Sequence, residues 1–272
     1  MTMGEYVAVP GGRLHYEVDG EGPPLTLIHA GVAHLRMWDA QVAAWRDRWR
    51  VIRYDTRGFG RTLSEDVPYS NRDDLRRLLD HLAVERTHLL GLSRGAQIAL
   101  DFAIEQPDRV SSLVWIAGGV GGHEGPDDGI DWDAIEKLED EKRWAELVEA
   151  ETRMWVDGLN QPTNRVDPDV RRRMVAWNME NYLAGQPAGQ AQPLDPPAVG
   201  RLAEVSVPVL VVWGSLDVAS TADSGELLAR SVAGSRRHVF DGVAHMVNME
   251  RPGELNRLVS DFLREVEAGS HS

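Results

Sequence analysis

The stretch THLLGLSRGAQIAL, residues 87–100, places a single serine, Ser93, between two glycines. Strand-forming residues precede it, and apolar residues at helical spacing follow it. The segment Gly91-Leu92-Ser93-Arg94-Gly95 fits the pattern G-x-S-x-G, a sharp strand-to-helix turn that strains the serine backbone and exposes its hydroxyl above a sheet. The stretch therefore predicts a nucleophilic serine at the edge of an α/β fold.

Composition excludes several classes of protein. The chain has 272 residues and 42% hydrophobic content, enough for a large core, and it contains no cysteine. With 29 Lys+Arg against 43 Asp+Glu, the net charge of -14 repels phosphate backbones and anionic lipids, so we expect no nucleic-acid partner and no membrane partner. The N-terminal residues resemble no signal peptide, so we expect a cytoplasmic protein. The sequence does not indicate an oligomeric state.

Strand-like runs alternate with helical patterns over most of the chain. A turn at residues 10–12 separates the first two runs, whereas the later ones are separated by segments long enough to cross over a sheet. We therefore predict an α/β fold with a mostly parallel eight-stranded sheet, an antiparallel start and helices on both faces. The predicted strands are residues 6–9, 14–18, 25–29, 50–54, 88–92, 113–116, 207–213 and 237–240.

The alternation stops between the sixth and seventh predicted strands. Residues 121–199 show helical patterns bounded by Gly- and Pro-rich segments. We therefore predict a helical cap inserted into a core formed by residues 1–120 and 200–272. Such a cap would cover the carboxyl edge of the sheet, where open α/β sheets bind ligands. Because the insertion holds 17 acidic and 8 basic residues, we expect a small-molecule substrate that is neutral or weakly polar.

A serine hydroxyl needs a base to take its proton and a carboxylate to hold that base. Around this type of turn the expected order along the chain is serine, acid, histidine. Asp217 follows the strand in VPVLVVWGSLD, and His245 lies in the loop after the next strand. Both therefore come at the carboxyl ends of strands, at the same edge as Ser93.

Five segments together resemble the α/β-hydrolase family over almost the whole chain. IHAGVAHLRMW (residues 28–38) is similar to the family's histidine-glycine segment, and YDTRGFGRT (54–62) to its D-x-R-G-x-G turn. GLSRG, WGSLD and GVAHMVNMERP resemble the nucleophile, acid and histidine segments, in the family's order. Within the family, the chain looks similar to capped esterases and enol-lactonases.

The resemblance implies a role for each matching residue. Ser93 would be the nucleophile, His245 the general base and then acid, and Asp217 the carboxylate that orients it. The oxyanion hole would consist of the backbone N–H groups of Gly31 and Arg94. Two residues depart from the family pattern, Ala30 in place of the usual glycine and an arginine at position 94, whose guanidinium can alter the charge of the pocket.

Other residues near these motifs have weaker assignments. We expect His29 to organise the oxyanion loop, and Asp55 and Arg57 to lock their turn. No metal cluster, P-loop or dinucleotide fingerprint is present in the sequence, so we predict no cofactor and no metal site. Candidate walls of the substrate pocket are His34, Trp38, Trp155, Trp177 and Met246.

We therefore predict a serine hydrolase that cleaves a small carboxylic ester or a lactone through an acyl-enzyme. Three alternatives remain open on the sequence. The same triad serves carbon-carbon bond hydrolysis of vinylogous diketones, and the fold also supports cofactor-free perhydrolase or haloperoxidase activity. A ligand-binding protein that has lost turnover is the third, although an intact Ser93, Asp217 and His245 argue against it.

Overall fold

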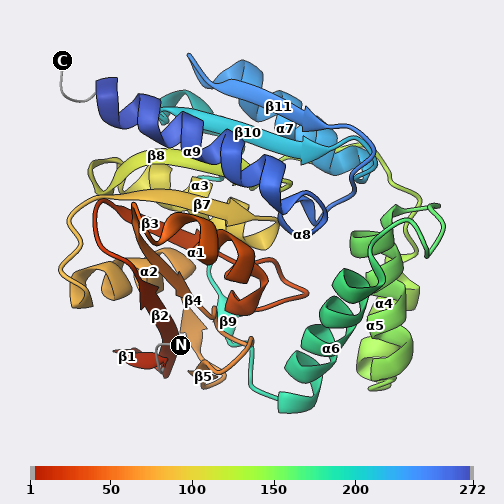
Figure 1. Cartoon of the computed structure of the whole chain (residues 1–272). Helices are drawn as coiled ribbons and strands as arrows, with labels where there is room; N and C mark the ends of the chain where they lie inside the picture. The colour runs from red at the N-terminus through yellow and green to blue at the C-terminus, as the bar shows by residue number, and fades with distance from the viewer. Residues whose placement is uncertain (1–3, 270–272) are drawn as a thin grey trace.

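The computed structural model describes residues 4–269, and its main feature is one large twisted sheet (Figure 1). All eight predicted strands are confirmed. A two-residue strand, β5 (Leu63–Ser64), also pairs with β2 at one side of the sheet. The principal strands are β1 (Glu5–Val9), β2 (Gly12–Asp19), β3 (Pro24–Ile28), β4 (Arg50–Tyr54), β7 (Thr87–Leu92), β8 (Val110–Ile116), β10 (Val209–Gly214) and β11 (Arg236–Phe240).

The strand order across the sheet is β1-β2-β4-β3-β7-β8-β10-β11. The pairs β1–β2 and β2–β4 are antiparallel, and every pair from β4 to β11 is parallel, as predicted. The chain passes from β3 to β4 on one side and later returns to the other side of β3 as β7. This reversal makes the carboxyl ends of β3 and β7 a topological switch point, the place where such sheets bind ligands.

Helices cover both faces of the sheet (Figure 1). On one face, α1 packs against α9, the long C-terminal helix whose apolar stripe of Leu255, Val259, Phe262 and Leu263 is buried. On the other face, α2 packs against α3, and α7 lies against β10. These helices are α1 (Asp39–Trp45), α2 (Asn71–His81), α3 (Arg94–Glu105), α7 (Ala219–Ser231), the short α8 (Val247–Glu250) and α9 (Pro252–Gly269).

The segment between β8 and β10 stands beyond the carboxyl ends of the strands (Figure 1). It contains α4 (Trp132–Asp140), α5 (Trp144–Thr152), a π-helical stretch (Arg153–Gly158) and α6 (Pro168–Ala184). Asp167 caps α6 by accepting a hydrogen bond from the backbone N–H of Asp169. The returning chain forms β9 (Gln190–Ala191), which pairs with β6 (Pro68–Tyr69) in a second, two-stranded sheet.

Close contact between α3 and the sheet requires the glycines around Ser93. A Cβ at Gly91 would lie 2.1 Å from the carbonyl oxygen of Gly95, and a Cβ at Gly95 would lie 2.2 Å from that of Ile28. The Ile28 carbonyl belongs to β3, which the parallel ladder with β7 holds in place, and the Gly95 carbonyl belongs to the first turn of α3. These glycines therefore allow the helix to begin directly above the sheet.

We expect Gly95→Ala to lower the free energy of unfolding by about 1–3 kcal/mol or more, because the methyl group overlaps the Ile28 carbonyl. Urea denaturation followed by circular dichroism measures the effect. Gly200→Ala is the matched control, since a Cβ there meets no atom within 4 Å. Equal urea midpoints for the two variants would contradict the close-contact explanation.

Candidate active site

Ser93 sits in a strained backbone conformation at the junction of β7 and α3. Its φ of 57° and ψ of -119° lie in a region that a residue with a side chain rarely adopts. The strand ends at Leu92 and the helix begins at Arg94, so the turn consists of Ser93 alone. This geometry lifts the side chain of Ser93 above the sheet edge, as the five-residue pattern predicts.

The structure brings Asp217 and His245 together. Nδ1 of His245 lies 2.9 and 2.8 Å from the two carboxylate oxygens of Asp217, and both side chains are almost completely buried. Because a carboxylate only accepts hydrogen bonds, Nδ1 carries the hydrogen, so that in the neutral ring Nε2 is the nitrogen with the lone pair. His245 therefore has the tautomer that a general base for a serine hydroxyl requires.

The loop after β3 is held by a buried histidine. His29 donates from Nδ1 to the carbonyl oxygen of Ala30 at 2.7 Å, and its Nε2 accepts from the backbone N–H of Thr56 at 3.0 Å. Burial lowers the pKa of His29 to about 4, so the ring is neutral at pH 7. His29 thus organises the turn that leads into Gly31.

The two expected oxyanion donors lie in neighbouring segments. A Cβ placed on Gly31 would be 3.8 Å from Cδ of Arg94, which puts the loop after β3 beside the start of α3. Arg94 is the first residue of α3, so its N–H has no acceptor within the helix. A helix N-terminus of this kind is suited to an anionic oxygen.

Ser93 and His245 line the same cavity, which has a volume of about 530 Å³. The glycine-rich chain after β8 forms one wall, and the start of α7 contributes Val218 and Thr221. Two tryptophans from the inserted segment, Trp132 and Trp155, line it as well. The Trp155 ring lies with its centroid 4.7 Å from that of His245, so the insertion directly contacts the histidine.

Of the five candidate wall residues, the structure places only Trp155 in this cavity. Trp38 and Met246 are fully buried, because they pack in the core beneath the site. His34 and Trp177 contact each other, with ring centroids 5.3 Å apart, and line a separate cavity of about 260 Å³. His34 caps the short helix that follows it, because its Nδ1 accepts from the N–H of Arg36.

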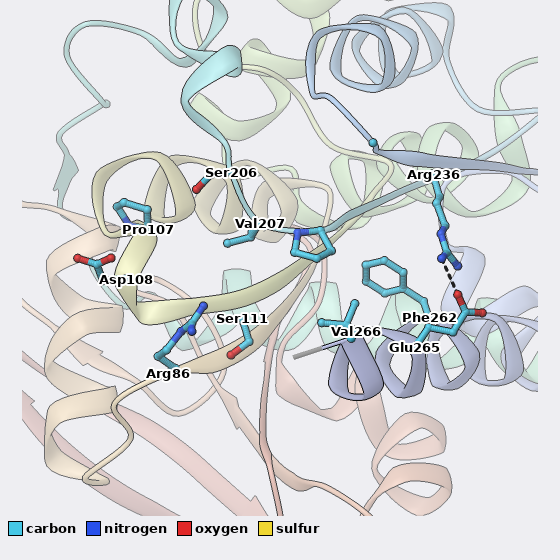
Figure 2. A pocket seen from close by; sticks show the side chains of 13 residues that line it. Arg86, Pro107, Asp108, Ser111, Ser206, Val207, Arg236, Phe262, Glu265 and Val266 are labelled. Atoms are coloured by element: carbon cyan, nitrogen blue, oxygen red, sulfur yellow. Dashed lines mark ion pairs between the residues drawn. The ribbon is translucent and has the colours of Figure 1, made fainter. Parts of the chain in front are cut away.

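A larger hollow, of about 830 Å³, lies away from these residues. Figure 2 shows Arg86, Pro107, Val207, Arg236 and Phe262 around it. Most of these residues lie at or just before the amino ends of the strands. The hollow therefore faces the edge of the sheet opposite to Ser93 and holds none of the candidate catalytic side chains.

Two residues that support the histidine loop were missed by sequence reasoning. Glu250 accepts a hydrogen bond from the N–H of Ala244, next to His245, and forms an ion pair with Arg165. Arg165 also donates to the carbonyl oxygens of Val156 and Asp157 in the π-helical stretch. Arg165 lies 85 positions from Glu250 and belongs to no motif, so no sequence signal could have revealed this link.

Turn-locking roles for Asp55 and Arg57 match the contacts in the structure. The carboxylate of Asp55 accepts from Nδ1 of His15 and from the N–H groups of Leu35 and Arg61. Arg57 forms a buried ion pair with Asp74 at 2.7 Å. Neither residue lines the cavity that contains Ser93.

Comparison with known proteins agrees with the fold and with the geometry of this site. The model of the "Alpha/beta hydrolase family" matches residues 27–258. The chain belongs to this family. Its fold is accordingly the α/β-hydrolase fold, and the protein resembles the esterases and enol-lactonases within it.

Individual relatives cover nearly the whole chain. The 2-hydroxy-6-oxo-6-phenylhexa-2,4-dienoate hydrolase of Comamonas testosteroni is 30% identical over 269 residues, which are 93% of this chain and 91% of the relative. The 3-oxoadipate enol-lactonase 1 of Acinetobacter baylyi is 27% identical over 85% of each chain. The crystal structure of an enol-lactonase from Burkholderia xenovorans superposes with a TM-score of 0.78 at 29% identity, covering 96% of this chain and 100% of the other.

Residues 4–269 lack two features, a helix that could span a membrane and a cluster of metal-binding side chains. No helix in this part of the chain is both long and apolar enough to cross a bilayer. No cluster of three or more histidine, aspartate or glutamate side chains with metal-binding geometry occurs there either.

Because the pKa of His29 is lowered in the folded state, we expect the protein to lose stability in acid. The folded state resists protonating this ring down to about pH 4, whereas the unfolded chain takes up the proton near pH 6.5. Its contribution is therefore present above pH 6.5 and is lost as the pH falls toward 4, by about 2 kcal/mol between pH 7.5 and pH 5. We expect His29→Gln to remove this part of the acid destabilisation.

Urea denaturation at the two pH values measures this difference. His81→Gln is the control, because His81 is exposed and lies outside the site. It should lose stability on acidification as the wild type does. A His29→Gln variant that loses just as much stability as the wild type would show that His29 does not contribute.

Proposed function

We propose that this hydrolase cleaves small carboxylic esters or lactones through a Ser93–His245–Asp217 triad. The observation that carries the proposal is the shared cavity. Ser93, in its strained turn, and His245, held by Asp217 in the tautomer of a general base, line one hollow of about 530 Å³. The similarity to enol-lactonases and esterases supports the same chemistry.

The proposed reaction has two halves, and in each half His245 acts first as a base and then as an acid. Oγ of Ser93 attacks the carbonyl carbon while Nε2 of His245 takes its proton, and the N–H groups of Gly31 and Arg94 stabilise the oxyanion. His245 then protonates the leaving alcohol, and an acyl-enzyme remains. Water repeats the sequence, which releases the acid and restores Ser93.

We propose that residues 121–199 act as the cap of this site and select its substrate. Trp132 and Trp155 line the cavity from this segment. Trp132 is 56% exposed, unusual for so large an apolar side chain. A bound small molecule would cover part of this exposed ring.

A second candidate is hydrolysis of a carbon-carbon bond, and the relatives favour it specifically. Besides the Comamonas testosteroni protein, a 2-hydroxy-6-oxononadienedioate/2-hydroxy-6-oxononatrienedioate hydrolase of Pseudomonas putida is 31% identical over 277 residues. The three substrates in these names are oxo acids with more than one double bond, and the same triad can serve this reaction. Parallel assays on a ring-fission diketone and on esters distinguish the two activities.

We expect Ser93→Ala to abolish hydrolysis of a chain-length series of p-nitrophenyl esters, because the acyl-enzyme cannot form without Oγ. A fluorophosphonate probe should label the wild type stoichiometrically and should not label the variant. Labelling without ester turnover would redirect the assay to lactones and diketones. If the wild type shows no labelling and no turnover, the proposed mechanism is refuted.

We expect Asp217→Asn to lower kcat by a factor on the order of 10³ to 10⁴, because an amide in place of the carboxylate favours the wrong tautomer of His245. KM should change little. Asp241→Asn is the matched control, since Asp241 is exposed and bonds only to Ser215 among the described side chains. Similar kcat values for the two variants would exclude Asp217 from the triad.

A further inference from the structure

The side chain of Arg94 runs from the nucleophile turn past the oxyanion loop. Its stem lies against Gly31, and its guanidinium donates to Oγ1 of Thr56 and, at 3.2 Å, to the hydroxyl of Tyr69. The guanidinium also lies over the ring of Phe59, 5.0 Å from the centroid. All three partners are neutral, and no carboxylate among residues 4–269 forms an ion pair with Arg94.

Several other buried or partly buried arginines of the fold are neutralised by carboxylates. A guanidinium carries its charge at every pH of interest, and burying it without a counter-ion is costly. The described structure supplies carboxylates to several such arginines, in the pairs Arg53–Glu17, Arg57–Asp74, Arg165–Glu250 and Arg171–Asp157. Arg94 is partly buried and lacks such a partner.

The charges around the cavity do not compensate Arg94. It is the one residue with a permanent positive charge among those that line the hollow, all of which belong to the described part of the chain. Asp128 is the one acidic residue in the same set. Its carboxylate accepts hydrogen bonds from both the N–H and the hydroxyl of Ser220, so it is already bound to the start of α7.

We propose that Arg94 is a specificity-determining residue that binds a carboxylate of the substrate. The preferred substrates are then anionic: esters or lactones whose acyl part carries a second, ionised carboxyl group away from the scissile carbonyl. This inference rests on the proposed function and deepens it. It replaces the neutral substrate expected from the acidic insertion, because the charge beside the nucleophile is positive whereas the acidic residues are spread over 79 positions.

The position of Arg94 explains why its side chain can select substrates while its N–H stabilises the oxyanion. The N–H of Arg94 lies at the start of α3, whereas the guanidinium lies beside Phe59, Thr56 and Tyr69. An acyl chain that passes the oxyanion loop would bring a terminal carboxylate to the guanidinium. A planar guanidinium can bind such a carboxylate through two hydrogen bonds.

The test compares matched substrates that differ in one charge. Mono-p-nitrophenyl esters of succinic, glutaric and adipic acid are assayed beside the corresponding methyl p-nitrophenyl diesters, after subtraction of spontaneous hydrolysis. We expect the wild type to prefer the charged member of each pair. In Arg94→Gln, the ratio of kcat/KM for charged over neutral substrate should fall by about 10- to 100-fold. Arg94→Lys should retain part of the preference.

A role of Arg94 as a structural brace predicts a different result. Both members of each pair would then lose activity equally, the ratio would stay constant, and the inference would be overturned. Arg86→Gln controls for the loss of one positive charge, because Arg86 is exposed at the opposite edge of the sheet and lacks an ion pair in residues 4–269. That variant should keep the ratio of the wild type.

A calorimetric titration separates failure of this inference from failure of the proposed function. Succinate, glutarate and adipate are titrated into Ser93→Ala and into the Ser93→Ala/Arg94→Gln double variant. Weaker binding to the double variant supports the anion site even where no ester is turned over. Equal or absent binding in both, together with an unchanged ratio in the kinetic assay, refutes it. Absence of ester turnover and probe labelling in the wild type refutes the triad mechanism instead.

Discussion

The site depends on one close contact, where the start of α3 touches the backbone of β3. Gly95 lies so near the carbonyl of Ile28 that a single methyl group would not fit, and this proximity places Ser93 directly above the switch point of the sheet. The strain at Ser93 persists because the parallel β3–β7–β8 ladder holds the strand before the turn, and the close contact between Gly95 and Ile28 holds the helix after it. The geometry of the nucleophile is thus maintained by the core of the fold.

The proposed catalytic groups differ in how they are held. Ser93 is positioned by backbone alone, whereas His245 depends on side chains: Asp217 on one ring nitrogen and the ring of Trp155 against it. The oxyanion loop depends on His29, which is kept neutral by burial and joined to Thr56. Because Thr56 also bonds to Arg94, the loop and the start of α3 are linked through one hydroxyl.

Much of this arrangement could be predicted from the sequence, for physical reasons. The central parallel strands, such as β7 and β10, are buried apolar runs, and Asp217 and His245 were found because parallel strands bring their carboxyl ends to one edge. The two-residue strands β5, β6 and β9 were missed because so few residues show no periodicity. The pocket walls were mostly misplaced: Trp38 and Met246 are at the right loops, but packing turns their side chains into the core.

The ion pair between Arg165 and Glu250 joins two parts of the protein that a domain diagram would separate. Arg165 holds the stretch that carries Trp155, and through Glu250 it also braces the backbone next to His245. The inserted segment is consequently part of the support of the proposed catalytic histidine. Grafting the insertion of a relative onto this core would remove that support together with the cavity walls, so substrate preference cannot be transplanted as an independent module.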